Sequence, residues 1–402
     1  MGPRADERSC MAISNIVEYS HLDPADVDAL GIELDALRRE VEGSLGSRDA
    51  AYIHRLIRLQ RALEVGSRAV ILLSPWRAGR WAGTAGLALS KCIENMELGH
   101  NIAHGQWDWM NDPEVHSSTW EWDMVGVSAQ WRYAHNYRHH VFTNVLNMDD
   151  DIGFSVLRVT RDQPWCWRYL GQPAQSLLLA LTFEWAIALY DLDAAFQRAR
   201  DTRVRRAAVR DLAVKISRQM LKDYAAFPAL AGRRWRAVLC ATLSANIIRN
   251  IWTYIVIVCG HFADGAEKFA AESIDGETRA EWYLRQMLGT ANVDAGPLLA
   301  IATGNLCYQI EHHLFPDLPS CRYRQIAGRV RVLCEKYDLP YTSGPLIRQF
   351  AQAQRTILLM SIPDCLLAAD ADDAPVSMRE RGRGLRTALR RARQRPPRAV
   401  AA

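Results

Sequence analysis

Histidine is the residue type in this sequence whose spacing points most directly to chemistry. Seven of the eleven histidines fall into three short clusters, which are His100 with His104, His135 with His139 and His140, and His312 with His313. Residues i and i+4 of a helix share one face, so His100 and His104 can direct two imidazoles at one point. We predict that three helices converge and bring these clusters around metal.

The number and type of these side chains limit which metal site they can form. Imidazole suits Zn, Cu, Fe and Ni, but a structural zinc takes four ligands and usually includes cysteine. A zinc protease needs Glu directly after its first histidine, where this chain has Asn101. A carboxylate di-iron bundle needs two Glu-x-x-His pairs, and only Glu97 with His100 qualifies, because Glu18 and His21 lie in a polar N-terminal region. We therefore expect two metal ions sharing a histidine-rich site.

Three more side chains are candidates for the same site. His261 directly follows an apolar stretch, although a single histidine at a helix end can simply interact with the helix dipole. Gln309 lies one helical turn before His313, and Asn305 one turn before Gln309. We expect both amides to hydrogen-bond around the metal ligands, with direct ligation as the alternative for Gln309 and an ordinary helix position as the alternative for Asn305. No catalytic group beyond the ligands and no nucleotide-binding residue is predicted.

Composition and charge suit a folded, mainly helical protein. The chain has 402 residues, 49% of them apolar, and a net charge of +4. Its nine cysteines are scattered without a CxxC pair, which argues against a zinc ribbon and for free thiols. We predict a flexible N-terminus at 1–20, one domain at 21–375 and a disordered tail at 376–402. The tail holds nine arginines, and no nucleic-acid-binding motif accompanies them.

Four apolar stretches are the candidates for membrane spans, at 69–93, 174–190, 236–260 and 297–307. None is a clean apolar run of about 18 residues, so hydropathy alone does not separate membrane helices from buried ones. Histidine clusters that share metals must lie on one membrane face. The stretches 174–190 and 236–260 would supply the two crossings needed between the second and the third cluster. The twelve Lys and Arg residues of 198–236 would then face outward, against the positive-inside tendency. An entirely soluble helical protein is the alternative.

The order HxxxH, HxxxHH and QxxHH resembles the three histidine boxes of the membrane fatty acid desaturases. The surrounding segments 97–113, 260–269 and 304–319 resemble, more narrowly, the mycobacterial acyl-CoA desaturases, and the similarity extends over about residues 12–375. The resemblance implies an all-α, polytopic membrane protein with a cytosolic helical cap that carries a di-iron site. It also implies eight iron ligands, which are His100, His104, His135, His139, His140, His261, His312 and His313.

The function implied by this resemblance is O2-dependent desaturation of a long-chain acyl-CoA. A cis double bond at Δ9, converting stearoyl-CoA to oleoyl-CoA, is expected. The electrons would come from NADPH through a separate flavin or iron–sulfur reductase, because the chain has neither GxGxxG after a strand nor a four-cysteine cluster motif. The expected location is the inner cell membrane, with several passes in contact with lipid and the site facing the cytoplasm.

Three other functions are compatible with the same motifs. Gln309 is typical of front-end desaturases, so a front-end or linoleoyl-CoA desaturase is one. A membrane fatty acid or alkane hydroxylase uses similar boxes. A catalytically inactive metal-binding or lipid-binding protein is the third, and the presence of a residue at every box position argues against it.

Overall fold

The computed structural model describes residues 19, 21–363 and 366. The predicted tail at 376–402 and, apart from Tyr19, the predicted flexible segment 1–20 lie outside the described residues. The described chain is mostly helical, as expected. Its two short strands, β1 (Asn292–Asp294) and β2 (Ser343–Pro345), pair in parallel.

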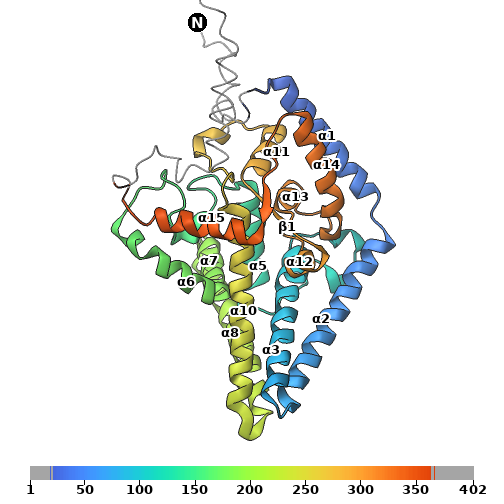
Figure 1. The fold of residues 1–402 in the computed structure, drawn as a ribbon, viewed down its shortest axis with the longest axis vertical. Helices are drawn as coiled ribbons and strands as arrows, with labels where there is room; N and C mark the ends of the chain where they lie inside the picture. The colour runs from blue at the N-terminus through green and yellow to red at the C-terminus, as the bar shows by residue number, and fades with distance from the viewer. Residues whose placement is uncertain (1–18, 20, 364–365, 367–402) are drawn as a thin grey trace, which may run out of the picture.

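Two long helical hairpins form a stalk below a broader head (Figure 1). One hairpin is α2 (Ser47–Leu73) with α3 (Arg77–Cys92). The other begins with α8 (Thr202–Met220), continues through a π-helical turn (Leu221–Ala226) and α9 (Phe227–Ala229), and returns as α10 (Trp235–His261). The turns of both hairpins lie together, because the guanidinium of Arg234 donates to the carbonyl oxygens of Leu72 at 2.6 Å and Ser74 at 3.1 Å.

The apolar stretches do not become four single spans. A turn after α2 divides 69–93, Thr182 divides 174–190 into α6 (Gln172–Leu181) and α7 (Phe183–Arg198), and 297–307 contains only the short α12 (Pro297–Ala302). Within the described residues, one helical run, Gly232–His261, is long and apolar enough to cross a membrane. Helix α6, from the 174–190 stretch, packs on α10, while α8, the π-helical turn and α9 precede α10 in the second hairpin, so the predicted crossing at 174–190 stays a prediction.

The arginine-rich first half of α8 lies beside the head rather than at the tip of the stalk. The carbonyl oxygen of Ala208 accepts a hydrogen bond from Gln130 at 3.0 Å. The guanidinium of Arg198, at the end of α7, lies 4.8 Å from the ring centroid of Tyr133. The first half of α8 therefore lies beside the segment that leads into the second histidine cluster.

The head is a helical layer with more than one apolar core. It contains α1 (Pro24–Gly43), α11 (Arg279–Leu288), α13 (Gln309–Leu314), α14 (Tyr323–Lys336) and α15 (Leu346–Leu359). Helix α1 starts at the N-cap Asp23, whose side chain accepts a hydrogen bond from the Asp26 N–H. The Asp26 side chain accepts one from the Asp23 N–H, and Pro24 occupies the first turn. Its face with Leu30 and Leu34 is buried against α11 and α14, so the helical spacing read from the sequence is confirmed.

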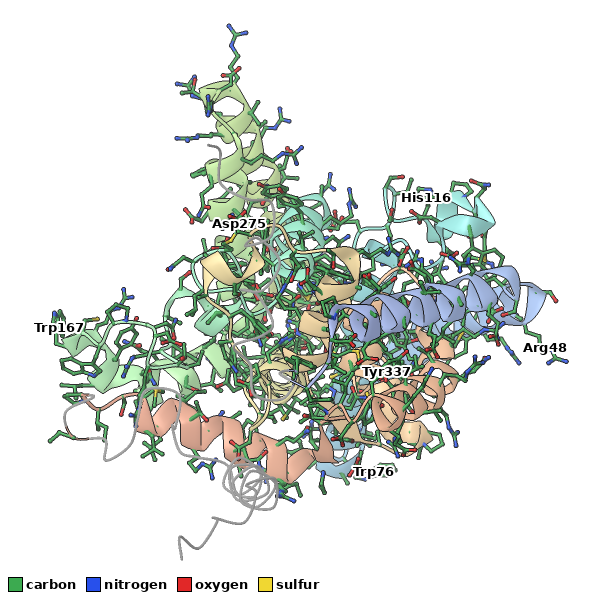
Figure 2. All side chains as sticks on the ribbon, turned by 90° about the horizontal axis from the view of Figure 1, so that it is seen from above. Arg48, Trp76, His116, Trp167, Asp275 and Tyr337 are labelled. Atoms are coloured by element: carbon green, nitrogen blue, oxygen red, sulfur yellow. The ribbon has the colours of Figure 1, made fainter. Side chains whose placement is uncertain are left out.

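Shorter elements complete the head. Arg48, at the start of α2, and Trp167 lie at opposite edges in the view from above (Figure 2). Short 3₁₀ turns occur there at Asp108–Met110, Pro113–Val115, Ile152–Ser155, Trp167–Gly171, Ala271–Ile274 and Ser320–Arg322, and one more, Gly232–Arg234, lies at the tip of the stalk before α10.

Candidate metal centre

Each histidine cluster lies on a helical segment that points into the top of the stalk. The first lies on a π-helical extension of α3 (Ile93–His100) and on α4 (Asn101–Ala103) with the turn after it. The second follows α5 (Ser128–Arg132) on another π-helical segment (Tyr133–His139). The third lies on α13.

The π-helical winding explains how His140 reaches the same side as His135 and His139. In a π-helix the hydrogen bond spans residues i and i+5, one residue more than in an α-helix. Here the N–H of His140 bonds to the carbonyl oxygen of His135. Residues i+4 and i+5 therefore both return toward the face of residue i, whereas α-helical winding places His140 at the edge of that face.

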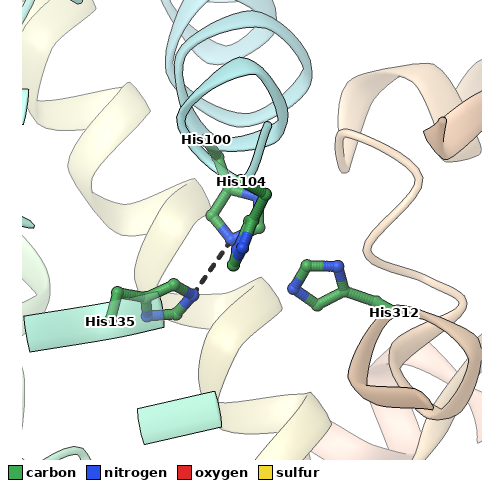
Figure 3. A group of neighbouring side chains, drawn as sticks. All are labelled: His100, His104, His135 and His312. Atoms are coloured by element: carbon green, nitrogen blue, oxygen red, sulfur yellow. Dashed lines mark hydrogen bonds between the residues drawn. The ribbon is translucent and has the colours of Figure 1, made fainter. Parts of the chain in front are cut away.

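The ring nitrogens form two separate groups, in each of which they lie within 4.8 Å of one another. The first group is His100, His104, His135 and His312, drawn in Figure 3, and the second is His139, His261 and His313. His140 lies between them, because it also groups with His135 and His139 and with His312 and His313. The structure thus brings together all eight histidines that the sequence pointed to.

Several ring nitrogens of these histidines lack hydrogen-bond partners, which suits the binding of metal ions. Among the described residues, no hydrogen-bond partner is found for Nε2 of His104, His139 and His312, Nδ1 of His261, or either nitrogen of His140. Buried polar atoms without partners are costly, and metal coordination is a way to satisfy several at one point. Neutral imidazoles also suit first-row transition metals.

Burial keeps most of the rings neutral. It lowers the pKa of His100 to about 4 and holds the pKa of His104, His135, His140, His312 and His313 well below the ordinary value. His139 differs: burial again opposes the charge, but the carboxylates of Asp149 and Asp151 outweigh it and raise the pKa to about 9. A neutral ring presents a free lone pair, so the other rings are ready to coordinate metal without losing a proton.

A second layer of polar groups orients the rings through their remaining nitrogens. The pairs are His100 Nδ1 with Asn101 Oδ1 at 3.0 Å, His139 Nδ1 with Asp149 Oδ1 at 3.0 Å, His312 Nδ1 with the Tyr323 hydroxyl at 3.1 Å, and His313 Nδ1 with Gln286 Oε1 at 3.2 Å. Such contacts fix which nitrogen faces a metal. The sequence analysis missed these partners. The acidic residues soon after the second cluster were a usable signal for Asp149, whereas Gln286 and Tyr323 had none.

A family model described as fatty acid desaturase matches residues 75–345, which contain every one of these histidines. The chain belongs to the fatty acid desaturase family. The family resemblance drawn from the motifs is therefore confirmed.

Named relatives in this family differ in what they act on. The NADPH-dependent stearoyl-CoA 9-desaturase of Mycobacterium tuberculosis is 51% identical over 377 residues, covering 92% of this chain and 88% of that protein. The sn-1 linoleoyl-lipid 6-desaturase of Synechocystis is 26% identical and covers 67% of this chain and 77% of that protein. Fatty acid desaturase 3 of Bos taurus is 23% identical, covering 67% of this chain and 58% of that protein.

Gln309 and Asn305 have different environments in this desaturase. The Gln309 side chain is buried, and its Oε1 has no partner among the described residues. This side chain packs tightly on Gly260: a Cβ added to Gly260 would lie 2.7 Å from the Cγ of Gln309. Asn305 lies in a left-handed turn with φ of 56°, not on a helix. Its Nδ2 donates to Glu97 Oε2 at 3.0 Å, so it contacts the supporting network instead of a histidine. A direct role of Gln309 around the ligands remains a prediction.

A mostly apolar cavity opens onto the histidines. Its walls include His100, His135, His139, His261, His312 and His313, together with Met96, Trp122, Met124, Trp131, Phe154, Phe183, Ile187 and Leu306. Trp122 and Trp131 come from the tryptophan-rich stretch between the first two clusters, whereas Trp107 packs in a separate apolar core. Apolar walls of this kind favour a hydrocarbon over water beside the ring nitrogens.

Proposed function

We propose that this chain is an O2-dependent acyl-CoA desaturase that introduces a cis Δ9 double bond, converting stearoyl-CoA to oleoyl-CoA. The observation that carries the proposal is the pair of converging imidazole groups beside an apolar cavity. The 51% identity to a stearoyl-CoA 9-desaturase over most of both chains supports this substrate and position.

Two iron ions are the proposed cofactor. His100, His104, His135 and His312 would hold one, His139, His261 and His313 the other, and His140 lies within reach of both groups. Iron bound there would supply the oxidising power needed to remove hydrogen from an unactivated methylene, with O2 as the co-substrate. The chain's own residues position the acyl chain and exclude water. The Asp149 carboxylate holds a proton on Nδ1 of His139, so the proton that His139 must lose to coordinate iron is the one on Nε2.

The electrons are proposed to come from NADPH through a separate flavin or iron–sulfur reductase. The reaction balances as –CH2–CH2– + O2 + 2 e⁻ + 2 H⁺ → –CH=CH– + 2 H2O, so two electrons must enter from outside for each double bond. Purified chain given NADPH and stearoyl-CoA alone is expected to form no oleoyl product, whereas adding the reductase fraction restores it. Full activity without the reductase would contradict this part of the proposal.

The proposed location is the inner cell membrane, with the stalk as the membrane-embedded part and the head in the cytoplasm. Both hairpin turns lie at the end of the stalk away from α13, the helix of the third histidine cluster (Figure 1), so each hairpin enters and leaves on one side. Exposed apolar side chains lie along and near those turns, including Leu73, Trp76, Trp81 and Leu230. Tryptophan is enriched where a helix meets the membrane surface, which supports this placement.

The test is product formation in membranes that contain the chain. Stearoyl-CoA, NADPH, the reductase and O2 are expected to give oleate, measured by gas chromatography, with about two irons per chain. His139→Ala should abolish the product. His116→Ala is the matched control, because His116 lies outside the site and bonds locally to Ser118. Activity that survives His139→Ala would overturn the assignment of the second cluster.

A front-end or linoleoyl desaturase is the second candidate, and Gln309 favours it. The position of the double bond separates the two, because a front-end enzyme adds a bond between an existing one and the carboxyl end. A membrane hydroxylase would give an alcohol in place of an alkene. The same gas chromatography distinguishes all three products.

A further inference from the structure

Asp191 is a buried carboxyl group in the cavity wall that no role described so far requires. It lies on α7, on the face that also presents Phe183, Glu184, Ile187 and Tyr190 to the cavity. Its exposed fraction is 1%. Unlike Glu184, whose Oε1 lies 2.6 Å from the guanidinium of Arg249, Asp191 has no hydrogen bond or ion pair with any residue that the structure describes.

This placement is costly for folding. A buried carboxyl group without a partner loses its hydration and gains nothing in return, so an apolar or amide residue is expected to be more stable there. Natural proteins retain such groups where function needs them, at the expense of stability. Asp191 is therefore a candidate for function on energetic grounds alone.

The environment of Asp191 suits a group that holds a proton. Burial raises the pKa of its carboxyl well above the ordinary value, and the nearby carboxylate of Asp151 raises it further. Asp191 is absent from every group of ring nitrogens and carboxylate oxygens that lie within 4.8 Å of one another in the described chain, so its position does not suggest a metal ligand. It faces the same cavity as His135 and His139.

We propose that Asp191 is a catalytic residue that delivers a proton into the cavity during desaturation. This inference rests on the proposed function, because that reaction consumes two protons in addition to two electrons for each O2 reduced to two waters. In the step, the O–H bond of the neutral Asp191 carboxyl breaks, its proton goes to oxygen that is being reduced in the cavity, and the carboxylate is reprotonated from solvent. The electrons come from the reductase and from the substrate C–H bonds, so Asp191 itself is neither oxidised nor reduced.

The experiment compares Asp191→Asn with the parent in three measurements. Positioned acid–base groups typically contribute about 10²–10⁴ in rate, so oleate formation should fall at least about 100-fold, with little change in KM for stearoyl-CoA. The amount of NADPH consumed per oleate should rise, because slow proton delivery allows partly reduced oxygen to be released as peroxide without forming oleate. The thermal midpoint of the metal-free protein should rise by a few degrees, and iron per chain should stay at the parent value.

Matched variants on the same helix make the result specific. Asp191→Glu restores an acid and should recover part of the rate. Asp193→Asn changes an exposed acid that accepts from Gln197 at 2.9 Å, and should leave rate and melting unchanged. Glu184→Gln breaks a buried pair, so it should lower the melting temperature, opposite to Asp191→Asn.

The possible outcomes separate this inference from the proposed function. A parent protein that forms no oleate with reductase and iron present would overturn the proposed function itself. A parent that forms oleate, with Asp191→Asn equally fast and equally coupled, would overturn the proton role alone. A variant that melts lower and loses iron would show that Asp191 is a structural or ligand residue, which also overturns the inference.

Discussion

Replacing Glu97 by glutamine would test how the segments around the metal centre are held together. The carboxylate is buried and accepts four hydrogen bonds. Oε1 accepts from the hydroxyls of Tyr52 at 2.7 Å and Ser320 at 2.6 Å, and Oε2 accepts from Nδ2 of Asn101 at 3.1 Å and Asn305 at 3.0 Å. One side chain thus joins α2, the first histidine cluster, the turn before α13 and the turn before α14.

The substitution keeps the volume and removes the acceptor capacity of one oxygen. The amide NH2 must face two donors, and the hydroxyls of Tyr52 and Ser320 can adapt by rotation whereas the amides of Asn101 and Asn305 cannot. A hydrogen bond to a charged group contributes about 1.5–3 kcal/mol and a neutral one about 0.5–1.5 kcal/mol. Weakening or losing four such bonds should cost about 2–4 kcal/mol, a large part of a total stability of about 5–15 kcal/mol.

Thermal melting of the detergent-solubilised protein, with iron analysis, is the assay for Glu97→Gln. A fall of about 4–8 °C is expected, since for a chain of this size about 1 kcal/mol corresponds to roughly 2 °C. Tyr52→Phe, which removes one of the four bonds, should cost less. The Asn101 amide also contacts His100, so iron should bind less tightly in Glu97→Gln. If Glu97→Gln melts like the parent and retains its iron, the four contacts do not hold the centre together.

Other parts of the site give separate predictions. Asp149→Asn should weaken iron binding or turnover by about 10–100-fold, measured as iron retained during dialysis against a chelator, because the amide cannot accept the His139 proton as strongly. If Gln309 only hydrogen-bonds around the ligands, Gln309→Ala should retain more iron than His312→Ala in a metal analysis, and equal losses would make Gln309 a ligand. Gly260→Ala should destabilise the protein by about 1–3 kcal/mol, seen as a lower melting temperature, because the new methyl group collides with the buried Gln309 side chain. An unchanged melting temperature would show that this side chain can move.

The histidines that the sequence singled out come together in the structure, whereas the groups that support them were not predicted. Spacing identifies His100 with His104, and His135 with His139, because both pairs follow the local periodicity of a helix. It misplaces Asn305, because the left-handed turn there depends on packing against Glu97, which lies more than 200 residues away. Long-range partners of this kind leave no local pattern in a single sequence.

The arrangement of the stalk was harder to predict for a different reason. Hydropathy favours 174–190 as a span over 202–229, yet the more polar run from α8 to α9 leads into α10 and forms the hairpin with it, with α9 packed against α10. The reason is that polar residues there are paired inside the bundle. Asp223 accepts from Lys91 at 2.8 Å and Arg68 at 2.9 Å. A hydropathy window counts these charges as unfavourable, although in the folded protein they meet each other and not lipid.

Buried polar groups in this molecule are of two kinds. Those that have partners stabilise the fold, and those without partners lie where we propose the chemistry. The Lys91, Arg68 and Asp223 network holds helices together, and every carboxylate oxygen in it has a cationic partner. At the metal centre the balance is reversed, because ring nitrogens and the Asp191 carboxyl are buried without partners among the described residues. Burying such groups without partners lowers the free energy of unfolding, and an ion or ligand that engaged them would restore it. Their concentration around one apolar cavity is the physical reason for proposing the reaction there.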